Sequence, residues 1–219
     1  EEGDEVCVSD SRGNILGVGH YQIGSIAVRI LEFGVDTISD DFFIRRLSSA
    51  FALRRTLGLI REENTCFRLV HGEGDFLPGL VIDIYGDTAV MQAHSPGMHF
   101  ARHKIAEALT MLPDAKIRNV YYKSDTTLPY KAHLDPDNEY LVGNYDGNIA
   151  IENGLQFNID WLKGQKTGFF VDQRENRKLL ESYAKGRRVL NMFCYTGGFS
   201  VYAMRGGAIS VDSVDSSSK

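Results

Sequence analysis

The residues best suited to chemistry lie near the carboxyl end of the sequence. Gly197 and Gly198 closely follow a short apolar run, and Asp215 ends a second run. Glycines let a backbone approach a ligand closely, and an acid at the end of the following strand can accept hydrogen bonds from ribose hydroxyls. This spacing predicts a nucleoside site. The alternative is a unit without a ligand, in which Asp215 ends the strand incidentally.

A strand, a turn, a helix and a second strand must position these residues. In an open α/β sheet, ligands bind outside the carboxyl ends of the strands, where both the glycines and the acid are expected. The first strand is an apolar run, which is typical of a strand buried on both faces. The expected elements are the strand Val189–Cys194, the turn Tyr195–Gly198, the helix Phe199–Met204 and the strand Ile209–Val214.

The glycine turn does not match a dinucleotide site. A pyrophosphate needs a G-x-G-x-x-G loop and a helix N-terminus that is free to receive it. Here the bulky Phe199 directly follows Gly198. The turn therefore favours a nucleoside whose 5′ substituent is an amino acid, which is S-adenosylmethionine (SAM).

Four segments of the chain resemble a known family. LNMFCYTGGFSVYA and GQKTGFFVDQRENR are similar to the two cofactor-side motifs of a class I SAM-dependent methyltransferase family, which includes bacterial large-subunit ribosomal RNA cytosine-5 methyltransferases. RLVHGEGDFLPGLVIDIYGD resembles the signature of its central domain, and DSRGNILGVGHYQIGSIAVRIL the end of its N-terminal PUA domain. The segments occur in family order and cover nearly the whole chain.

The resemblance implies a mixed α+β and α/β architecture. We expect a partial PUA-like β module at 1–34, a connecting helix at 35–62, a central α+β domain at 63–140, and the start of a Rossmann-like methyltransferase domain at 141–219. Three amino-terminal strands are too few for a closed barrel, and two parallel strands leave sheet edges and faces uncovered. We therefore expect a fragment of a longer protein, truncated at both ends.

Other elements follow from local patterns. A long helix is expected to begin at the cap Ser39, and a single helix to span Met98–Leu112. Asn153-Gly154 predicts a tight hairpin, because this pair is among the strongest hairpin signals. A helix is expected over Val171–Ala184, and the polar stretch Asp125–Asp137 predicts a linker or a loop that faces the substrate.

The resemblance also implies the cofactor-binding residues. Gln173 and Arg174, together with Lys166, can donate charge-assisted hydrogen bonds to the methionine carboxylate of SAM. Asp215 is the expected ribose acceptor. Asp172 has a simpler alternative as a helix cap, and at least one of Phe169 and Phe170 is expected to pack against the helix. The expected wall of the site is formed by Phe193, Tyr195, Gly197 and Gly198.

The catalytic residues are expected outside this sequence. A cytosine-5 methyltransferase needs a thiolate that attacks C6 of the base, which makes C5 nucleophilic toward the methyl group. Cys194 lies at the end of the first cofactor strand, whereas the family's nucleophile comes later in the chain. We therefore interpret Cys194 as a packing or cofactor-wall residue and expect the nucleophile beyond Lys219.

Two further clusters of charged residues invite functional interpretations. Glu73 and Asp75 lie in a glycine-rich turn that Arg68 is expected to pin, with an RNA contact as the alternative. The net charge of -5 argues mildly against nucleic-acid binding by bulk electrostatics. A local basic patch remains compatible with it, and its alternative is a solvated face paired to Asp40, Asp41, Glu62 and Glu63. The five arginines of this patch are Arg45, Arg46, Arg54, Arg55 and Arg61.

The predicted function is SAM-dependent methylation of RNA, with 5-methylcytosine in 23S ribosomal RNA as the product. A methyltransferase of another base or substrate class, or a noncatalytic RNA-binding module, are the alternatives. No metal is expected, because the six histidines and three cysteines lack zinc-ligand spacing. No apolar stretch approaches the roughly 20 residues of a membrane helix. A cytoplasmic protein without membrane contact is expected, and its oligomeric state is open, a homodimer included.

Overall fold

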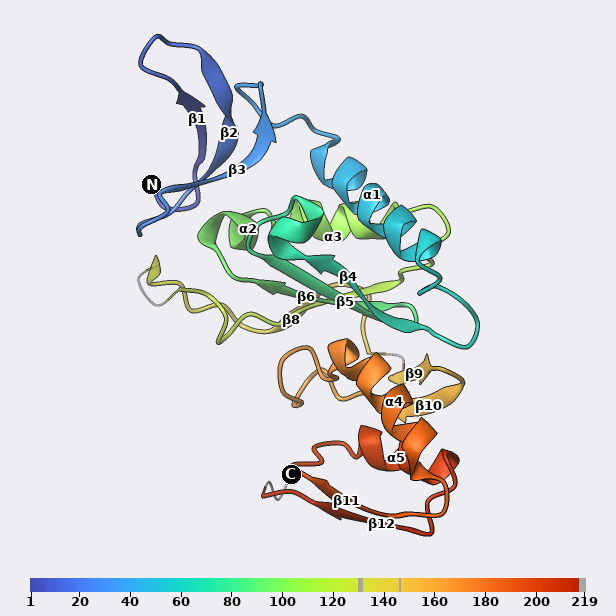
Figure 1. Ribbon diagram of the computed structural model, residues 1–219. Coiled ribbons are helices and arrows are strands. Elements are labelled where there is room, and N and C mark those ends of the chain that lie inside the picture. Colours follow the sequence, from blue (N-terminus) through green and yellow to red (C-terminus); the bar gives the residue numbers. More distant parts are fainter. Residues whose placement is uncertain (130–131, 146, 217–219) are drawn as a thin grey trace. The chain divides into compact units, whose positions relative to one another are not determined.

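The chain forms two compact units in the computed structural model, which describes residues 1–129, 132–145 and 147–216. The first unit is Glu1–Gly168 and the second is Phe169–Lys219 (Figure 1). The domain limits expected from the sequence stay predictions. By compactness, residues 141–168 group with the residues that precede them.

The first unit begins with a three-stranded antiparallel sheet in the order β1-β2-β3. The sequence pattern predicts the third strand over Ser25–Ile30, whereas the strand begins three residues later, at Val28. The N–H of Gln22 donates to the carbonyl of Ala27 at 2.8 Å, so the residues between them form the hairpin turn rather than a strand. That these residues belong to a PUA-like module stays a prediction. The strands are β1 (Glu5–Ser9), β2 (Ile15–Tyr21) and β3 (Val28–Phe33).

A five-stranded sheet in the order β4-β5-β6-β7-β8 forms the centre of the first unit. Its neighbouring strands are antiparallel except β6 and β7, which run parallel. Four of the strands match predictions from the sequence pattern within a few residues. The predicted ranges are Thr65–Val70, Gly79–Tyr85, Thr88–His94 and Ile117–Lys123. The last one, β8, was not predicted, because it has only four residues and follows a polar loop. The strands are β4 (Cys66–His71), β5 (Leu80–Tyr85), β6 (Thr88–Ala93), β7 (Asn119–Tyr122) and β8 (Glu139–Val142).

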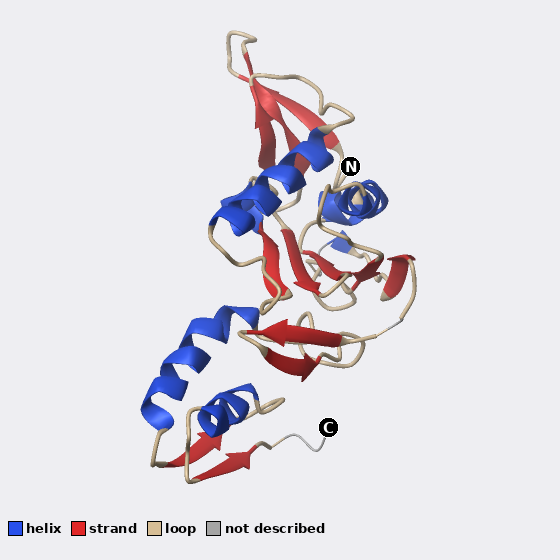
Figure 2. Ribbon diagram, turned by 90° about the vertical axis from the view of Figure 1, so that its right-hand side faces the viewer, coloured by secondary structure: helices blue, strands red, loops and turns tan. Residues whose placement is uncertain are grey.

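Three helices cover one face of this sheet: α1 (Phe42–Thr56), α2 (Pro96–Phe100) and α3 (Arg102–Thr110) (Figures 1 and 2). The prediction that Ser39 caps α1 is wrong, because the helix begins at Phe42, three residues after Ser39. The Ser39 hydroxyl donates instead to Asp41 at 2.6 Å. The single helix predicted from Met98 is also wrong. At Ala101 the backbone has ψ of -2°, which separates α2 from α3.

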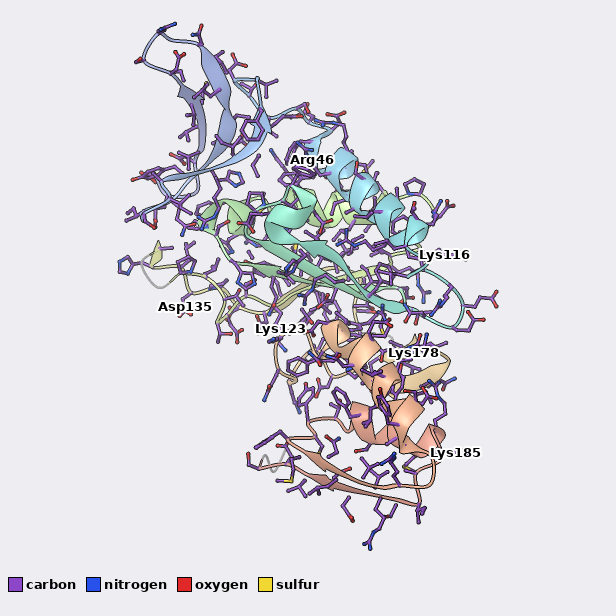
Figure 3. All side chains as sticks on the ribbon, in the orientation of Figure 1. Arg46, Lys116, Lys123, Asp135, Lys178 and Lys185 are labelled. Atoms are coloured by element: carbon purple, nitrogen blue, oxygen red, sulfur yellow. The ribbon has the colours of Figure 1, made fainter. Side chains whose placement is uncertain are left out.

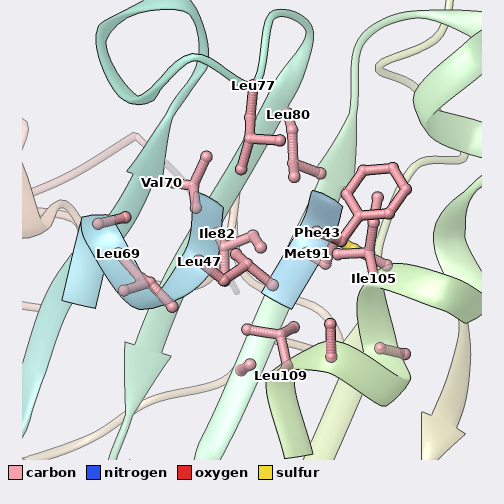
Figure 4. Close-up of a cluster of buried hydrophobic side chains, with 14 of the residues drawn as sticks. Phe43, Leu47, Leu69, Val70, Leu77, Leu80, Ile82, Met91, Ile105 and Leu109 are labelled. Atoms are coloured by element: carbon pink, nitrogen blue, oxygen red, sulfur yellow. The ribbon is translucent and has the colours of Figure 1, made fainter. Parts of the chain in front are cut away.

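The hydrophobic core lies between these helices and the sheet (Figure 4). Side chains alternate along a strand, so one set of residues faces the helices and the other faces away. On β5, Leu80, Ile82 and Ile84 belong to the core, while Val81, Asp83 and Tyr85 occupy the alternate positions. The face away from the helices is therefore more polar.

A hairpin and a buried tryptophan segment follow in the first unit. The strands β9 (Ile149–Glu152) and β10 (Leu155–Asn158) pair antiparallel. Asn153 and Gly154 have φ of 49° and 79°, which confirms the predicted tight turn. Trp161 is buried and stacks on Tyr85, with ring centroids 6.1 Å apart. This contact holds the segment after β10 against the face of the sheet that points away from the helices. In the loop predicted over Asp125–Asp137, residues 130–131 lie outside the described residues.

The second unit contains the predicted strand-turn-helix-strand arrangement. Its two strands pair in parallel, as expected for such a unit. The first strand is not buried on both faces, and this prediction is wrong. Leu190 is 63% exposed, because α5 is the helix that packs on this strand pair within the described residues. The elements are the 3-10 turn η3 (Val171–Gln173), α4 (Arg174–Ala184), β11 (Arg188–Met192), α5 (Gly198–Arg205) and β12 (Ser210–Val214).

Two kinds of feature are absent from residues 1–129, 132–145 and 147–216. Among the residues that the structure describes, a membrane-spanning helix is not found. In the same part of the chain, no three His, Cys, Asp or Glu side chains come together as a potential metal site.

Candidate cofactor site

The turn after β11 has an unusual backbone. Phe193 and Tyr195 have φ of 58° and 49°, in the left-handed region that residues with a Cβ rarely adopt, and Gly197 has φ of 76°. The Gly197 N–H donates to the carbonyl of Cys194 at 2.8 Å, which closes the turn. Two non-glycine residues in this region within three positions mark the turn as a candidate functional site.

The structure brings Asp215 to this turn. The N–H of Tyr195 donates to Oδ2 of Asp215 at 2.8 Å, and the N–H of Cys194 donates to the carbonyl of Val214 at 3.1 Å. The Asp215 residue is exposed. A carboxylate offers about four lone-pair positions, so it can accept from several donors at once. The two predicted residues thus lie together, and Asp215 is suited to accept ribose hydroxyls.

Gly198 begins α5 at a place where a side chain would be crowded. A Cβ there would lie 3.2 Å from Cδ of Arg177 and 3.7 Å from the Phe169 ring. Arg177 is 2% exposed, and its guanidinium lies 4.5 Å from the Phe169 ring centroid. It also donates to the carbonyl of Phe170 at 3.0 Å. Arg177 was not predicted as a site residue, although it ends the segment GQKTGFFVDQRENR.

Gln173 and Arg174 lie at the start of α4. Gln173 is half-buried and accepts from Nδ2 of Asn176 at 3.0 Å, and Arg174 is buried. The alternative role of Asp172 as a side-chain cap of this helix is wrong, because Gln173 occupies the cap position and no side chain caps the helix there. A role of Gln173 and Arg174 as cofactor ligands stays a prediction.

The aromatic residues of the site differ in exposure. Phe169 is buried, as expected for a packing residue, and Phe170 meets Tyr195 edge to face with ring centroids 5.4 Å apart. Phe193 is 84% exposed, so its side chain is not packed onto the turn. The thiol of Cys194 is half-buried, with Sγ 3.9 Å from the carbonyl oxygen of Tyr195.

Polar side chains brace the two strands beneath the site. Nδ2 of Asn191 donates to Oγ of Ser200 at 2.8 Å, and the Ser200 and Ser213 hydroxyls lie 2.6 Å apart. These three residues come from β11, α5 and β12. The chain of hydrogen bonds fixes the helix against both strands and therefore supports the turn between them.

In the first unit, the charged residues pair differently from the prediction. Arg68 does not pin Asp75; it forms a two-pronged ion pair with Asp83, and both N···O distances are 2.9 Å. The hydroxyl of Thr167 also donates to Asp83, at 2.6 Å. Asp75 is held instead by Arg54, with an NH2···Oδ2 distance of 2.8 Å, and by the N–H of His71 at 2.6 Å. Register explains the difference, because Arg68 and Asp83 are direct partners across β4 and β5.

The five arginines predicted as a basic patch are already engaged. Arg54 is buried in its pair with Asp75, and Arg55 pairs with Asp114 at 3.0 Å. Arg45 pairs with Glu32 at 3.0 Å and with Asp41 at 3.7 Å. Arg46 donates to the carbonyl of Leu31 and Arg61 to the Asn153 side chain. The ion-paired alternative is closer to the structure, although only Asp41 among its expected partners takes part.

The comparison with protein families agrees with the strand-turn-helix-strand site. The family model of the S-adenosylmethionine-dependent methyltransferases matches residues 68–218. The chain belongs to this family. The match includes both the turn with Asp215 and the central sheet, so the methyltransferase family accounts for most of the two units.

Two relatives align with this methyltransferase chain over nearly the whole length of the chain. Ribosomal RNA large subunit methyltransferase I from Tolumonas auensis is 41% identical over 221 residues, which cover 98% of this chain and 55% of the relative. The protein of the same name from Alteromonas mediterranea is 43% identical over 217 residues, which cover 97% of this chain and 54% of the relative. The chain therefore spans about half the length of these relatives.

Solved structures show the same fold. A provisionally assigned SAM-dependent methyltransferase from Streptococcus mutans matches with a TM-score of 0.82 and 25% identity, over 100% of this chain and 56% of its own. A second solved methyltransferase, complexed with S-adenosylhomocysteine (SAH), matches with the same score, identity and coverage. The mixed α/β methyltransferase-like fold of the chain is thus confirmed.

Proposed function

We propose that the protein containing this chain transfers a methyl group from SAM to large-subunit ribosomal RNA and forms 5-methylcytosine in 23S rRNA. The identity of 41% and 43% to two proteins named ribosomal RNA large subunit methyltransferase I supports the substrate class. The contact between Tyr195 and Asp215 carries the proposal for the cofactor, because it places a carboxylate beside the glycine turn. The choice of cytosine C5 as the methylated atom rests on the family resemblance.

The residues of the second unit fit the parts of SAM. Asp215 accepts hydrogen bonds from the ribose hydroxyls, and Gln173 and Arg174 donate to the methionine carboxylate. Gly197 and Gly198 allow the backbone to approach the cofactor. Phe193 and Tyr195 complete the wall of the site. When bound, SAM supplies an electrophilic methyl group for the base.

We assign no attacking thiolate to Cys194. Its N–H and its neighbour Tyr195 are both tied to the end of β12, so Cys194 is part of the turn that holds the cofactor. The nucleophile is proposed to lie in the part of the protein beyond this chain. We accordingly expect the 219-residue chain alone to transfer no methyl group, because positioning the acceptor base supplies much of the rate.

Methyl transfer by the full-length protein tests the proposal. Unmodified 23S rRNA would be incubated with SAM that carries a labelled methyl group, and the labelled nucleoside would be identified after digestion. Label in 5-methylcytidine supports the proposal, while label in another nucleoside contradicts the base assignment. RNA binding without transfer would instead indicate a noncatalytic RNA-binding module. The 219-residue chain at equal concentration is the matched comparison.

A further inference from the structure

A polar cleft of about 520 Å³ lies in the first unit, on the side of the sheet away from the core helices. Its walls come from three strands, from the loop after β7 and from the segment after β10. Every residue of its lining belongs to the first unit. The lining is Arg68, Val81, Gln92, His94, Lys123, Asp125, Thr126, Thr127, Asn138, Leu162, Lys163, Gly164, Gln165 and Lys166.

The floor of this cleft is formed by strand side chains that point away from the core. Phe67 and Leu69 point into the core, so Arg68 between them faces the other way. Gln92 lies between Met91 and Ala93, which also belong to the core. Lys123 comes directly after β7 and lies on the side of the sheet away from α1 (Figure 3).

Lys123 holds the opposite wall in place. Its ammonium donates to the carbonyl of Trp161 at 2.7 Å and to that of Gly164. Asp160 accepts from the N–H of Lys163 at 2.9 Å, which fixes the next turn of the same segment. Burial lowers the pKa of Lys123, while Asp125 and Asp160 oppose that change. The wall segment is therefore anchored, and it presents Lys163 and Lys166 as exposed side chains.

The charge of the cleft is opposite to that of the chain. Four of its side chains are basic and one, Asp125, is acidic, whereas the whole chain has a net charge of -5. The nearby carboxylate of Asp83 is fully buried and bound by Arg68 and Thr167. Burial, with a smaller effect from Arg68, lowers the pKa of His94, which favours the neutral ring. The cleft is therefore suited to an anion.

The remaining lining indicates which anion fits. Gln92 and Asn138 carry amides, and two threonines carry hydroxyls, which can pair with the edges of a base. Leu162 and Val81 add apolar surface. The volume falls in the range of about 300–1,000 Å³ that is typical of small-ligand pockets. We propose that this cleft binds a single-stranded nucleotide of the substrate RNA, with its phosphate at Lys163 and Lys166, and we thereby assign Lys166 to the RNA rather than to the methionine carboxylate of SAM. The proposal rests on the proposed function for the identity of the RNA.

Charge reversal at Lys163 tests this site. Lys163→Glu and, as a matched control, Lys104→Glu would be compared by fluorescence anisotropy, without SAM, on a labelled unstructured RNA of roughly ten nucleotides. Both lysines are exposed, and Lys104 lies on α3, on the other side of the sheet. We expect Lys163→Glu to weaken RNA binding at least roughly tenfold. The slope of log K against log salt concentration should also become shallower by about 0.7, the value for one phosphate contact with a single strand. Lys104→Glu should change both much less.

Lys166→Glu provides a second measurement at the same wall. It should weaken RNA binding in the same way as Lys163→Glu. Equal losses in the Lys104→Glu control, or no loss in either cleft variant, would overturn the proposal. A full-length protein that binds RNA through these lysines but transfers no methyl group would contradict the proposed function alone. Circular dichroism of each variant confirms that the fold is retained.

Discussion

The N–H of Tyr195 donates a hydrogen bond of 2.8 Å to the carboxylate of Asp215, across 20 residues of sequence. This bond joins the carboxyl ends of the two parallel strands of the second unit. It also places this carboxylate beside the left-handed turn of Phe193, Tyr195 and Gly197. The turn and the acid that the sequence pattern singled out thus lie together, and their role as a nucleoside site stays a prediction.

Replacing Asp215 should weaken cofactor binding in the full-length protein. Asp215→Ala removes the proposed ribose acceptor, which is expected to cost on the order of 1–3 kcal/mol, or roughly 5- to 150-fold in affinity. Isothermal titration calorimetry with SAH measures this change. Asp212→Ala is the control, because Asp212 is an exposed acid that lies within β12. Unchanged affinity in a folded Asp215→Ala protein would remove Asp215 from the site.

Cys194→Ser should keep substantial methyl transfer in the full-length protein. A serine preserves the size of the side chain, and the turn is held by backbone groups that the substitution leaves intact. The measurement is transfer of a labelled methyl group to ribosomal RNA, together with SAH affinity. Loss of transfer and of a covalent RNA adduct, with normal SAH affinity, would show that Cys194 is the nucleophile after all.

Arg54 and its neighbour Arg55 should differ strongly in their effect on stability. The Arg54 side chain is 10% exposed and its partner Asp75 4%, whereas Arg55 and Asp114 are 54% and 74% exposed. Removing one partner of a buried pair leaves a buried charge and costs about 3–5 kcal/mol. An exposed pair contributes about 0–1 kcal/mol. Urea unfolding of Arg54→Leu and Arg55→Leu measures both, and equal losses would contradict this interpretation.

His20 should make the protein less stable in mild acid. Its side chain lies against the backbone of Gly97 and is 6% exposed, and burial lowers its pKa from 6.5 to about 4. Between these values the unfolded chain binds a proton that the folded chain does not. The contribution of His20 to the free energy of unfolding is therefore fully present above pH 6.5 and is lost as the pH drops toward 4. At pH 5 the loss is about 2 kcal/mol.

A comparison of variants isolates this contribution. The loss in unfolding free energy between pH 7.5 and pH 5 should be smaller in His20→Gln than in the unsubstituted protein. His103→Gln replaces an exposed histidine and should leave the loss unchanged. If His20→Gln loses as much stability in acid as the unsubstituted protein, the histidine is not the group responsible.

The sequence by itself determined the features that depend on neighbouring residues. The Asn153-Gly154 hairpin is one, because its left-handed φ values are a local preference of these two residues. The strand-turn-helix-strand unit around Gly197 and Gly198 is another, since apolar runs and glycines set its order. The helix break at Ala101 was missed because no glycine or proline marks that residue.

Only the tertiary structure decided which charged residues meet. Arg68 was expected to hold Asp75, but strand register places it opposite Asp83, while Asp75 receives Arg54 from a helix. The polar cleft has the same origin, because Arg68 and Lys123 reach it only once the sheet has paired β4 with β5 and β6 with β7. An ion pair or a cleft depends on the distance between atoms that are far apart in sequence. Folding fixes those distances, and no local pattern of residues records them.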